Sequence, residues 1–425
     1  FWQWSTLYIN GTGISVRLAG ALNIGATALY LTNGTLNTDG KTFTSTGSMV
    51  TETGTKSLVL GASTFNIGTW NNAVPTGFTF TPGTGTVNIT ASGTLTGTQT
   101  FYNLVFTGVA AITAQISLTG TITFTNTFVI TGNEPTKYRI LVQSNTSGTA
   151  RTITGPAVGL TATNCDFQDI TLTNAKDFSA QSDIGNCGGN TGITFPAALN
   201  LYIVHTSGAM SVSNAGKWKL ADLTTAGRVP LPQDSAFGVA GSFTGASTVT
   251  MDCPRIGSLD LSGVTQAVGW ALGNAMACYG NYILGSNVTP SGVRAVTLSG
   301  RSNFNLNTYG KSCYLFSVSA PGGVYTNLSN LVLSGGILNY IGTFDFNDFN
   351  LLGSSTILDL EGGVVYLGNG ILETTYATNT GWIVYIAGGT LYSEGSTIIS
   401  SPASGTGDIR FGSSNRTYNN VKFSG

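Results

Sequence analysis

The sequence predicts an all-β protein, and more specifically a parallel β-solenoid (β-helix) of stacked short strands. Three observations predict this fold: apolar and polar residues alternate along most of the chain, turn residues interrupt the alternation at short intervals, and short motifs recur. Almost no segment has a sustained helical period. A string of β-sandwich domains requires the same kind of strands and is the alternative fold.

Alternation with a period of two places apolar side chains on one face of a strand and polar side chains on the other. The pattern is clear at residues 86–90, 121–125 and 358–361. Gly, Asn or Ser-Gly interrupts such runs roughly every 8–12 residues, which is typical of short strands joined by tight turns. The exception is the neighbourhood of residues 217–222, where we expect one or two helical turns.

Internal repeats favour the solenoid over the sandwich. Residues 100–108 and 417–425 share the pattern Thr, aromatic, any residue, Asn, aliphatic, any residue, Phe, hydroxyl, Gly. Residues 166–172 and 345–351 share the element Asp-Phe-x-Asp. Units of one strand cannot bury an apolar face alone, whereas stacked copies can. With roughly 20 residues per coil and a rise of about 4.8 Å, the chain would form a rod on the order of 100 Å long.

Composition excludes several classes of protein. Hydrophobic residues make up 41% of the 425 residues, too many for a disordered low-complexity chain, and 58 are glycine. The 17 basic and 18 acidic residues form no basic run, which argues against nucleic acid and against electrostatic docking on anionic membranes. Polar residues interrupt every apolar stretch, so no transmembrane helix and no membrane insertion are expected.

The middle of the chain changes character. Charged residues cluster within residues 177–238, where Pro196, Pro230 and Pro232 also lie. Proline lacks the N–H that a β-ladder needs. We therefore expect a first solenoid segment at 1–176, a junction at 177–238 and a second solenoid segment at 239–425. The chain starts with Phe rather than Met, and we expect the natural chain to extend beyond the given residues.

Four segments carry a resemblance to a known group of proteins. They are the Trp-bearing opening at 1–4, the element Tyr-Asn-Leu-x-Phe-Thr-Gly at 102–108, the element at 164–170 and the run at 229–234. Together they resemble the Gly/Thr-rich repeat proteins of tailed phages and environmental bacteria, which are described as tail-fibre-like or adhesin-like. The resemblance implies a virion or an extracellular, cell-surface location, and it carries no catalytic residue over to this sequence.

Carboxylate pairs are the candidates for catalysis, because some solenoids cut polysaccharides with two carboxylates. Asp359 and Glu361 share one face of a predicted strand and are expected in solvent about 7 Å apart. Two further pairs lie in the recurring element: Asp166 with Asp169, and Asp345 with Asp348. We interpret all three pairs as turn caps and solvated surface, because Asp is a common turn residue and both copies of the element would otherwise need an active site.

The sequence offers few residues for a nucleophilic, phosphate-binding or metal site. His205 is the only histidine, so any Ser-His-Asp or Cys-His arrangement would have to use it, and we interpret it as a bystander. Residues 34–42 imitate a phosphate loop but have one residue too many between their glycines. The five cysteines contain no Cys-x-x-Cys pair and are interpreted as buried free thiols, with a bridge between Cys165 and Cys187 as the alternative. No metal and no cofactor are expected.

Aromatic residues give the better indication of function. Trp2 and Trp4 share one face of a predicted strand, and Tyr8 extends that face. Aromatic rings beside amides stack on sugar rings, so these three residues are the predicted glycan-binding site. The alternative is that they cap the end of the solenoid or fill its corners.

These inferences predict a non-enzymatic structural or adhesive element of a phage tail fibre or similar virion appendage. A bacterial cell-surface adhesin or surface-layer protein is one alternative, and a polysaccharide-degrading, tailspike-like enzyme is the other. Charge-poor faces covered with Thr and Ser can pack on one another, so we expect self-association, as in a homotrimer, or association with other virion proteins. A surface glycan is the further candidate partner.

Overall fold

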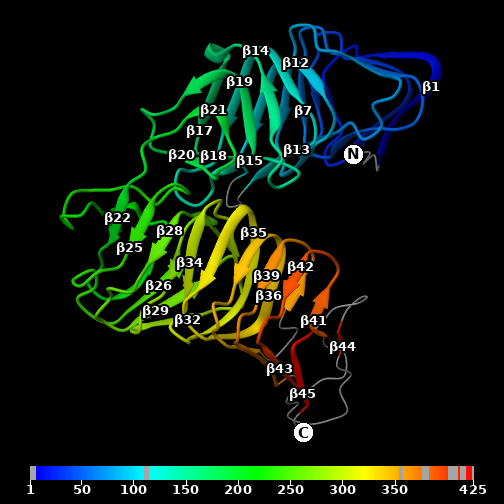
Figure 1. The fold of residues 1–425 in the computed structure, drawn as a ribbon. Coiled ribbons are helices and arrows are strands. Elements are labelled where there is room, and N and C mark those ends of the chain that lie inside the picture. The colour runs from blue at the N-terminus through cyan, green and yellow to red at the C-terminus, as the bar shows by residue number, and fades with distance from the viewer. Residues whose placement is uncertain are drawn as a thin grey trace. The chain divides into compact units, whose positions relative to one another are not determined.

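The structure is an all-β solenoid, which confirms the predicted fold class. The computed structural model describes residues 6–109, 114–353, 358–375, 382–400, 410–411 and 418–423. Strands make up 56% and helices 2% of the chain, and the stacked strands form about 17 turns. The chain divides into two compact units, unit 1 (Phe1–Ala197) and unit 2 (Ala198–Gly425) (Figure 1).

The described strands of unit 1 form three sheets. The first contains β1 (Thr6–Arg17), β3 (Ala28–Asn37), β5 (Ser48–Thr51), β6 (Lys56–Val59), β8 (Thr69–Asn71) and β9 (Phe78–Thr81). The second contains β2 (Leu22–Asn23), β4 (Phe43–Thr44), β7 (Thr64–Ile67), β10 (Thr86–Ile89), β12 (Gln99–Thr107), β14 (Ile122–Thr131), β16 (Arg151–Thr154), β17 (Leu160–Thr163), β19 (Ile170–Asp177) and β21 (Thr191–Thr194). The third contains β11 (Gly93–Leu95), β13 (Gln115–Leu118), β15 (Ile140–Ser144), β18 (Cys165–Gln168) and β20 (Ile184–Asn186), and a 3-10 turn, η1, spans Ala157–Gly159.

The described strands of unit 2 form two sheets. The smaller contains β23 (Gly208–Ser211), β26 (Ser247–Met251), β29 (Val268–Leu272) and β32 (Val288–Ser291). The larger begins with β22 (Asn200–Ile203), β24 (Trp218–Lys219), β25 (Ser235–Phe237), β27 (Arg255–Ile256), β28 (Ser258–Asp260), β30 (Met276–Cys278), β31 (Tyr282–Ile283), β33 (Ala295–Leu298), β34 (Asn303–Asn307), β35 (Ser312–Asn327) and β36 (Leu331–Asp345). It continues with β37 (Leu351–Gly353), β38 (Leu358–Leu360), β39 (Val364–Tyr366), β40 (Ile371–Thr374), β41 (Trp382–Ile386), β42 (Thr390–Tyr392), β43 (Thr397–Ser400), β44 (Arg410–Phe411) and β45 (Asn420–Phe423).

Strands one coil apart pair in parallel. Phe316 on β35 pairs with Ile337 on β36, which pairs with Leu358 on β38, so one position of the coil recurs after 21 residues here. The next interval is longer, because Leu358 pairs with Val384. Parallel stacking of single strands rules out the sandwich alternative, whose sheets are antiparallel. Among the described strands, the pairing of β22 with β24 is antiparallel.

Apolar ladders fill the inside of the coils. In unit 1, Phe43, Phe65, Val87, Leu104 and Phe128 occupy successive rungs of one ladder, and all five are buried. The rings of Phe43 and Phe65 stack with their centroids 4.8 Å apart. Burial of each such side chain contributes roughly 1.5–3 kcal/mol relative to exposure, so the ladder stabilises the stacking of the coils.

Amides and hydroxyls form ladders on the outer face. The Asn88 amide nitrogen donates to the Asn66 side-chain oxygen at 2.6 Å, and the Asn66 amide nitrogen donates to the Thr44 hydroxyl at 3.0 Å. An amide has both a donor and an acceptor, so the same side chain can bond to the coil below and the coil above. At these rungs uncharged groups alone connect the coils on the outer face.

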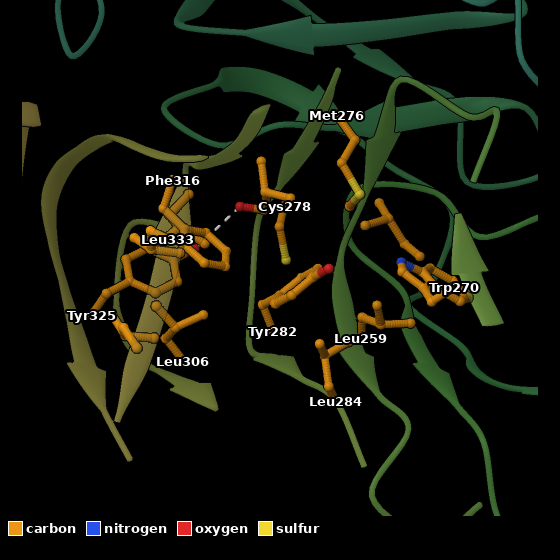
Figure 2. Packing of buried hydrophobic residues seen from close by; sticks show 14 of the residues in the cluster. Leu259, Trp270, Met276, Cys278, Tyr282, Leu284, Leu306, Phe316, Tyr325 and Leu333 are labelled. Atoms are coloured by element: carbon orange, nitrogen blue, oxygen red, sulfur yellow. Dashed lines mark hydrogen bonds between the residues drawn. The ribbon is translucent and has the colours of Figure 1, made fainter. Parts of the chain in front are cut away.

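The core of unit 2 includes aromatic residues whose polar groups find partners inside the solenoid. Figure 2 shows Tyr282, Phe316 and Tyr325 packed with Cys278 and with neighbouring leucines. The buried Tyr325 hydroxyl donates to the Cys278 carbonyl at 3.1 Å and accepts from the Gly300 N–H at 3.0 Å. These bonds offset the cost of burying the phenol.

The recurring Asp-Phe-x-Asp element forms corners of the coil. In the first copy Asp169 has φ 55°, and in the second Asn347 and Asp348 have φ 50° and 64°. Asp and Asn tolerate this left-handed region better than other non-glycine residues, since their short side chains bond to nearby backbone. In both copies the Phe is buried, so the element turns the chain while it anchors the corner in the core.

The predicted junction at 177–238 contains regular strands on both sides of the division at Ala197 and Ala198. The helical turns expected in the neighbourhood of 217–222 are present only in part: one 3-10 turn, η2 (Ala215–Lys217), ends at Lys217, and Trp218 begins strand β24. Trp218 is buried, and its indole N–H donates to the Val212 carbonyl at 2.8 Å.

Candidate functional site

A pair of stacked tyrosines marks the outer face of unit 1. Tyr8 on β1 pairs in register with Tyr30 on β3, and their ring centroids lie 4.9 Å apart at an interplanar angle of 23°. Tyr8 is 54% exposed, so the face of its ring is open to a ligand. Trp2 and Trp4, the other residues of the predicted glycan site, lie outside the described residues.

Amides and a carboxylate follow along the strands from this tyrosine face, which we define as Tyr8 and Tyr30. The Asn33 amide nitrogen donates to the Asn10 side-chain oxygen at 3.2 Å, and the Thr32 hydroxyl donates to Glu52 at 2.7 Å. Polar groups beside an exposed ring are the usual composition of a sugar-stacking surface. Tyr30 was missed in the sequence, although its distance of 22 residues from Tyr8 is one coil.

A second exposed tyrosine stack lies on unit 2. Tyr366 on β39 pairs with Tyr392 on β42, with ring centroids 4.6 Å apart and an interplanar angle of 5°. Tyr392 is 46% exposed. Sequence reasoning missed this pair too, because the register that brings the two residues together depends on the length of the coil between them.

The carboxylates Asp359 and Glu361 differ in their surroundings. Asp359 was expected in solvent, and this is wrong in part: it is half-buried on β38, between Leu338 and Tyr385 in neighbouring coils. One of its oxygens is buried and has no hydrogen-bond partner among the described residues. Burial, and then the nearby charge of Glu361, raise the pKa of Asp359 above its usual value. Glu361 is exposed.

The carboxylates of the recurring element have structural partners. Asp166 is buried and accepts from the Arg139 guanidinium at 2.9 and 3.1 Å, and Asp169 accepts from the Gly148 N–H at 3.0 Å. In the second copy, Asp345 accepts from the Asn347 N–H at 2.8 Å and Asp348 accepts from the Asn369 N–H at 2.7 Å. Asp169, Asp345 and Asp348 thus accept hydrogen bonds from backbone N–H groups, in agreement with their interpretation as caps. For Asp166 the interpretation as cap or solvated surface is wrong, because this side chain is buried and its carboxylate pairs with Arg139.

His205 and the cysteines are core groups. His205 is 9% exposed, and neither ring nitrogen has a hydrogen-bond partner among the described residues. All five cysteines are free, so the alternative bridge between Cys165 and Cys187 is absent. Four are buried and Cys313 is half-buried. Burial raises the pKa of Cys278 and of Cys313 to about 12, so both thiols are protonated at neutral pH.

A cavity of about 220 Å³ lies within unit 2, and sequence reasoning did not find it. Its exposed rim has one guanidinium, Arg294, and three serine hydroxyls. The serines are Ser291, Ser312 and Ser334. Its buried floor includes Tyr282 and Phe316, which Figure 2 shows within the core. A polar rim above an aromatic floor is the composition of a small-ligand site.

The described part of the chain contains no group of three or more His, Cys, Asp or Glu side chains placed to hold a metal ion. None of its helices has the length and apolar character needed to cross a membrane. The chain was compared with protein-family models, with curated protein sequences and with solved structures, and no match was found.

Proposed function

We propose that the chain is a non-enzymatic structural or adhesive β-solenoid of a phage tail fibre or a similar virion appendage. The observation that carries the proposal is the outer surface of the coils. It carries ladders of amides and hydroxyls, such as Asn88, Asn66 and Thr44, and two stacks of tyrosine rings. Such a surface is suited to contact with sugars and with further copies of the same chain.

The contacts of the carboxylates support a non-enzymatic role. Asp166 neutralises Arg139, and Asp169, Asp345 and Asp348 accept hydrogen bonds from backbone N–H groups. A glycosidase needs two carboxylates free to act as acid and as base or nucleophile. Four of the six carboxylates considered for catalysis thus have a structural task.

The proposed location is the virion or the cell surface, and the proposed partners are other copies of the chain and surface glycans. The tyrosine face of unit 1 is the proposed glycan contact, because an exposed ring flanked by amides fits a sugar ring. A homotrimer is the proposed assembly, since hydroxyl-covered faces with little charge can approach one another without electrostatic repulsion.

Electron microscopy of the purified full chain, combined with light scattering, tests the assembly. We expect slender particles with more than one copy per particle. A monomer at micromolar concentration would contradict the proposed self-association.

A glycan array tests adhesion. We expect Tyr8→Ser to reduce glycan binding, because the exposed ring is lost. Tyr102→Ser is the matched control, since Tyr102 lies on β12 of the same unit and stacks on no ring of a described residue. Cleavage of any arrayed polysaccharide by the wild-type chain would favour the tailspike-like enzyme instead.

A further inference from the structure

The cavity of unit 2 has a positive charge that its surroundings do not neutralise. Arg294 is the one charged residue among those that line it, and it forms no ion pair with any described carboxylate. Burial holds the pKa of the Tyr282 phenol well above its usual value and raises that of the Cys313 thiol to about 12. Both groups are neutral at physiological pH, so the guanidinium is available to an anion.

The backbone of neighbouring coils builds the cavity. Strand β32 is the last strand of the smaller sheet, and it contains Pro290, which has no N–H for a further ladder bond. The turn that follows passes close to the preceding coil: Gly292 has φ +97°, and a Cβ there would lie 2.8 Å from the Leu272 carbonyl oxygen. Glycine and proline geometry therefore constrains the backbone of the turn that leads to Arg294.

Hydroxyl groups line the same cavity as the guanidinium. Ser291 lies at the end of β32, Ser312 and Tyr314 lie at the start of β35, and Ser334 lies on β36. A hydroxyl can donate and accept a hydrogen bond, so the rim hydroxyls can act as donors or as acceptors toward the hydroxyls of a sugar. The cavity is smaller than the range of about 300–1,000 Å³ that is typical for drug-sized ligands, which suits a single ring.

We propose that this cavity binds one carboxylate-bearing sugar unit, with its carboxylate on the Arg294 guanidinium and its hydroxyls on the serine rim. A guanidinium binds a carboxylate through two parallel hydrogen bonds. One positive charge matches the single charge of a carboxylate, whereas a phosphate monoester has a charge of about −1.5 to −2 at neutral pH. The inference goes beyond the proposed function, because an adhesive or structural solenoid does not require this site or this ligand.

The bound sugar can come from two sources: it is either a free sugar acid or one residue of an acidic polysaccharide. D-galacturonate and a galacturonate tetramer are the probes that distinguish them, and D-galactose is the neutral control. Ligand-observed NMR on the full chain measures all three. We expect a dissociation constant on the order of 1 mM for galacturonate, as is usual for a ligand of this size, and no measurable binding of galactose. Tighter binding of the tetramer assigns the polysaccharide source, and equal binding assigns the free acid.

Arg294→Gln is the decisive variant. We expect it to raise the dissociation constant for galacturonate at least about tenfold, because a charge-assisted pair of hydrogen bonds is lost. Ser312→Ala should raise it by about two- to tenfold. Arg17→Gln is the matched control in unit 1, where Arg17 pairs with Asp39 at 2.7 Å, and it should leave binding unchanged.

Three results would overturn the proposal. They are equal binding of galacturonate and galactose, unchanged binding in Arg294→Gln, and stronger competition by inorganic phosphate than by galacturonate. The variants change exposed side chains at the rim, so they leave the core of unit 2 intact. Galacturonate binding to the cavity of unit 2 does not depend on glycan binding at the tyrosine face of unit 1. Failure of one proposal therefore leaves the other testable.

Discussion

The buried ion pair between Arg139 and Asp166 predicts a large and local effect of one substitution. The two side chains are 1% and 0% exposed, and the guanidinium donates to both carboxylate oxygens. Asp166→Asn keeps the shape of the side chain but leaves the Arg139 charge buried without its counter-charge. Removal of one partner of a buried pair costs about 3–5 kcal/mol, so we expect unit 1 to lose stability by that amount.

The recurring element supplies the matched control. Asp345 occupies the position in the second copy that Asp166 occupies in the first, but it is half-buried and caps the Asn347 N–H. Asp345→Asn keeps an oxygen that can accept this bond and leaves no buried charge. We therefore expect a change of less than about 0.5 kcal/mol in unit 2.

Hydrogen exchange with mass spectrometry on the full chain separates the two units. Peptides that cover β15 and β18 should lose between about two and nearly four powers of ten in protection in Asp166→Asn, at about 1.4 kcal/mol per power of ten. Peptides from unit 2 should be unchanged. Equal and small effects of Asp166→Asn and Asp345→Asn would refute the reasoning, because they would mean that the buried pair contributes no more than a surface cap.

Three further predictions concern other features of the solenoid. Asp359→Asn should stabilise its coil at pH 7 and have no effect at pH 3. The pKa of Asp359 is raised in the fold, so the folded chain favours the protonated carboxyl, and the wild-type chain loses stability as the pH rises through the raised pKa. Asparagine stays neutral and avoids this loss. Thermal unfolding at both pH values checks this, and a pH-independent effect would contradict it. Five thiols should react with a thiol reagent when the chain is unfolded without reductant, and a count of three would reveal a disulfide. In the native chain the reaction should be slow at pH 8, because burial raises the pKa of Cys278 to about 12. Gly257→Ala should cost about 1–3 kcal/mol or more, since a Cβ there would lie 1.9 Å from the Asp234 carbonyl oxygen, and Gly20→Ala, which meets no atom within 4 Å, should cost far less in the same denaturation assay.

Local pattern was sufficient to predict the class of fold. Alternation correctly placed Leu358 and Leu360 inside the coil, where both are fully buried. Both copies of Asp-Phe-x-Asp lie at corners of a coil, because a corner needs residues that accept positive φ and a Phe that enters the core. These features are properties of a few consecutive residues, so the linear sequence contains them.

Neighbours across coils were harder to predict, because the length of a coil is not constant. Val87 pairs with Leu104 and Leu358 pairs with Val384, intervals of 17 and 26 residues. The sequence therefore contains no spacing that distinguishes the pairing of Tyr8 with Tyr30, or of Tyr366 with Tyr392, from a chance occurrence of two tyrosines. Of the helical turns expected near residue 218, one 3-10 turn that ends at Lys217 is present, and Trp218, whose indole is buried, begins a strand instead.

The sequence by itself determined that this chain forms stacked β-coils with apolar ladders inside and uncharged polar ladders outside, since strand period and turn chemistry are local. Only the tertiary structure decided which side chains meet: the ion pair of Arg139 with Asp166, the stacked tyrosines and the cavity beside Arg294. The physical reason is that each of these depends on the register between coils. That register is set by the packing of the whole ladder and not by any single strand.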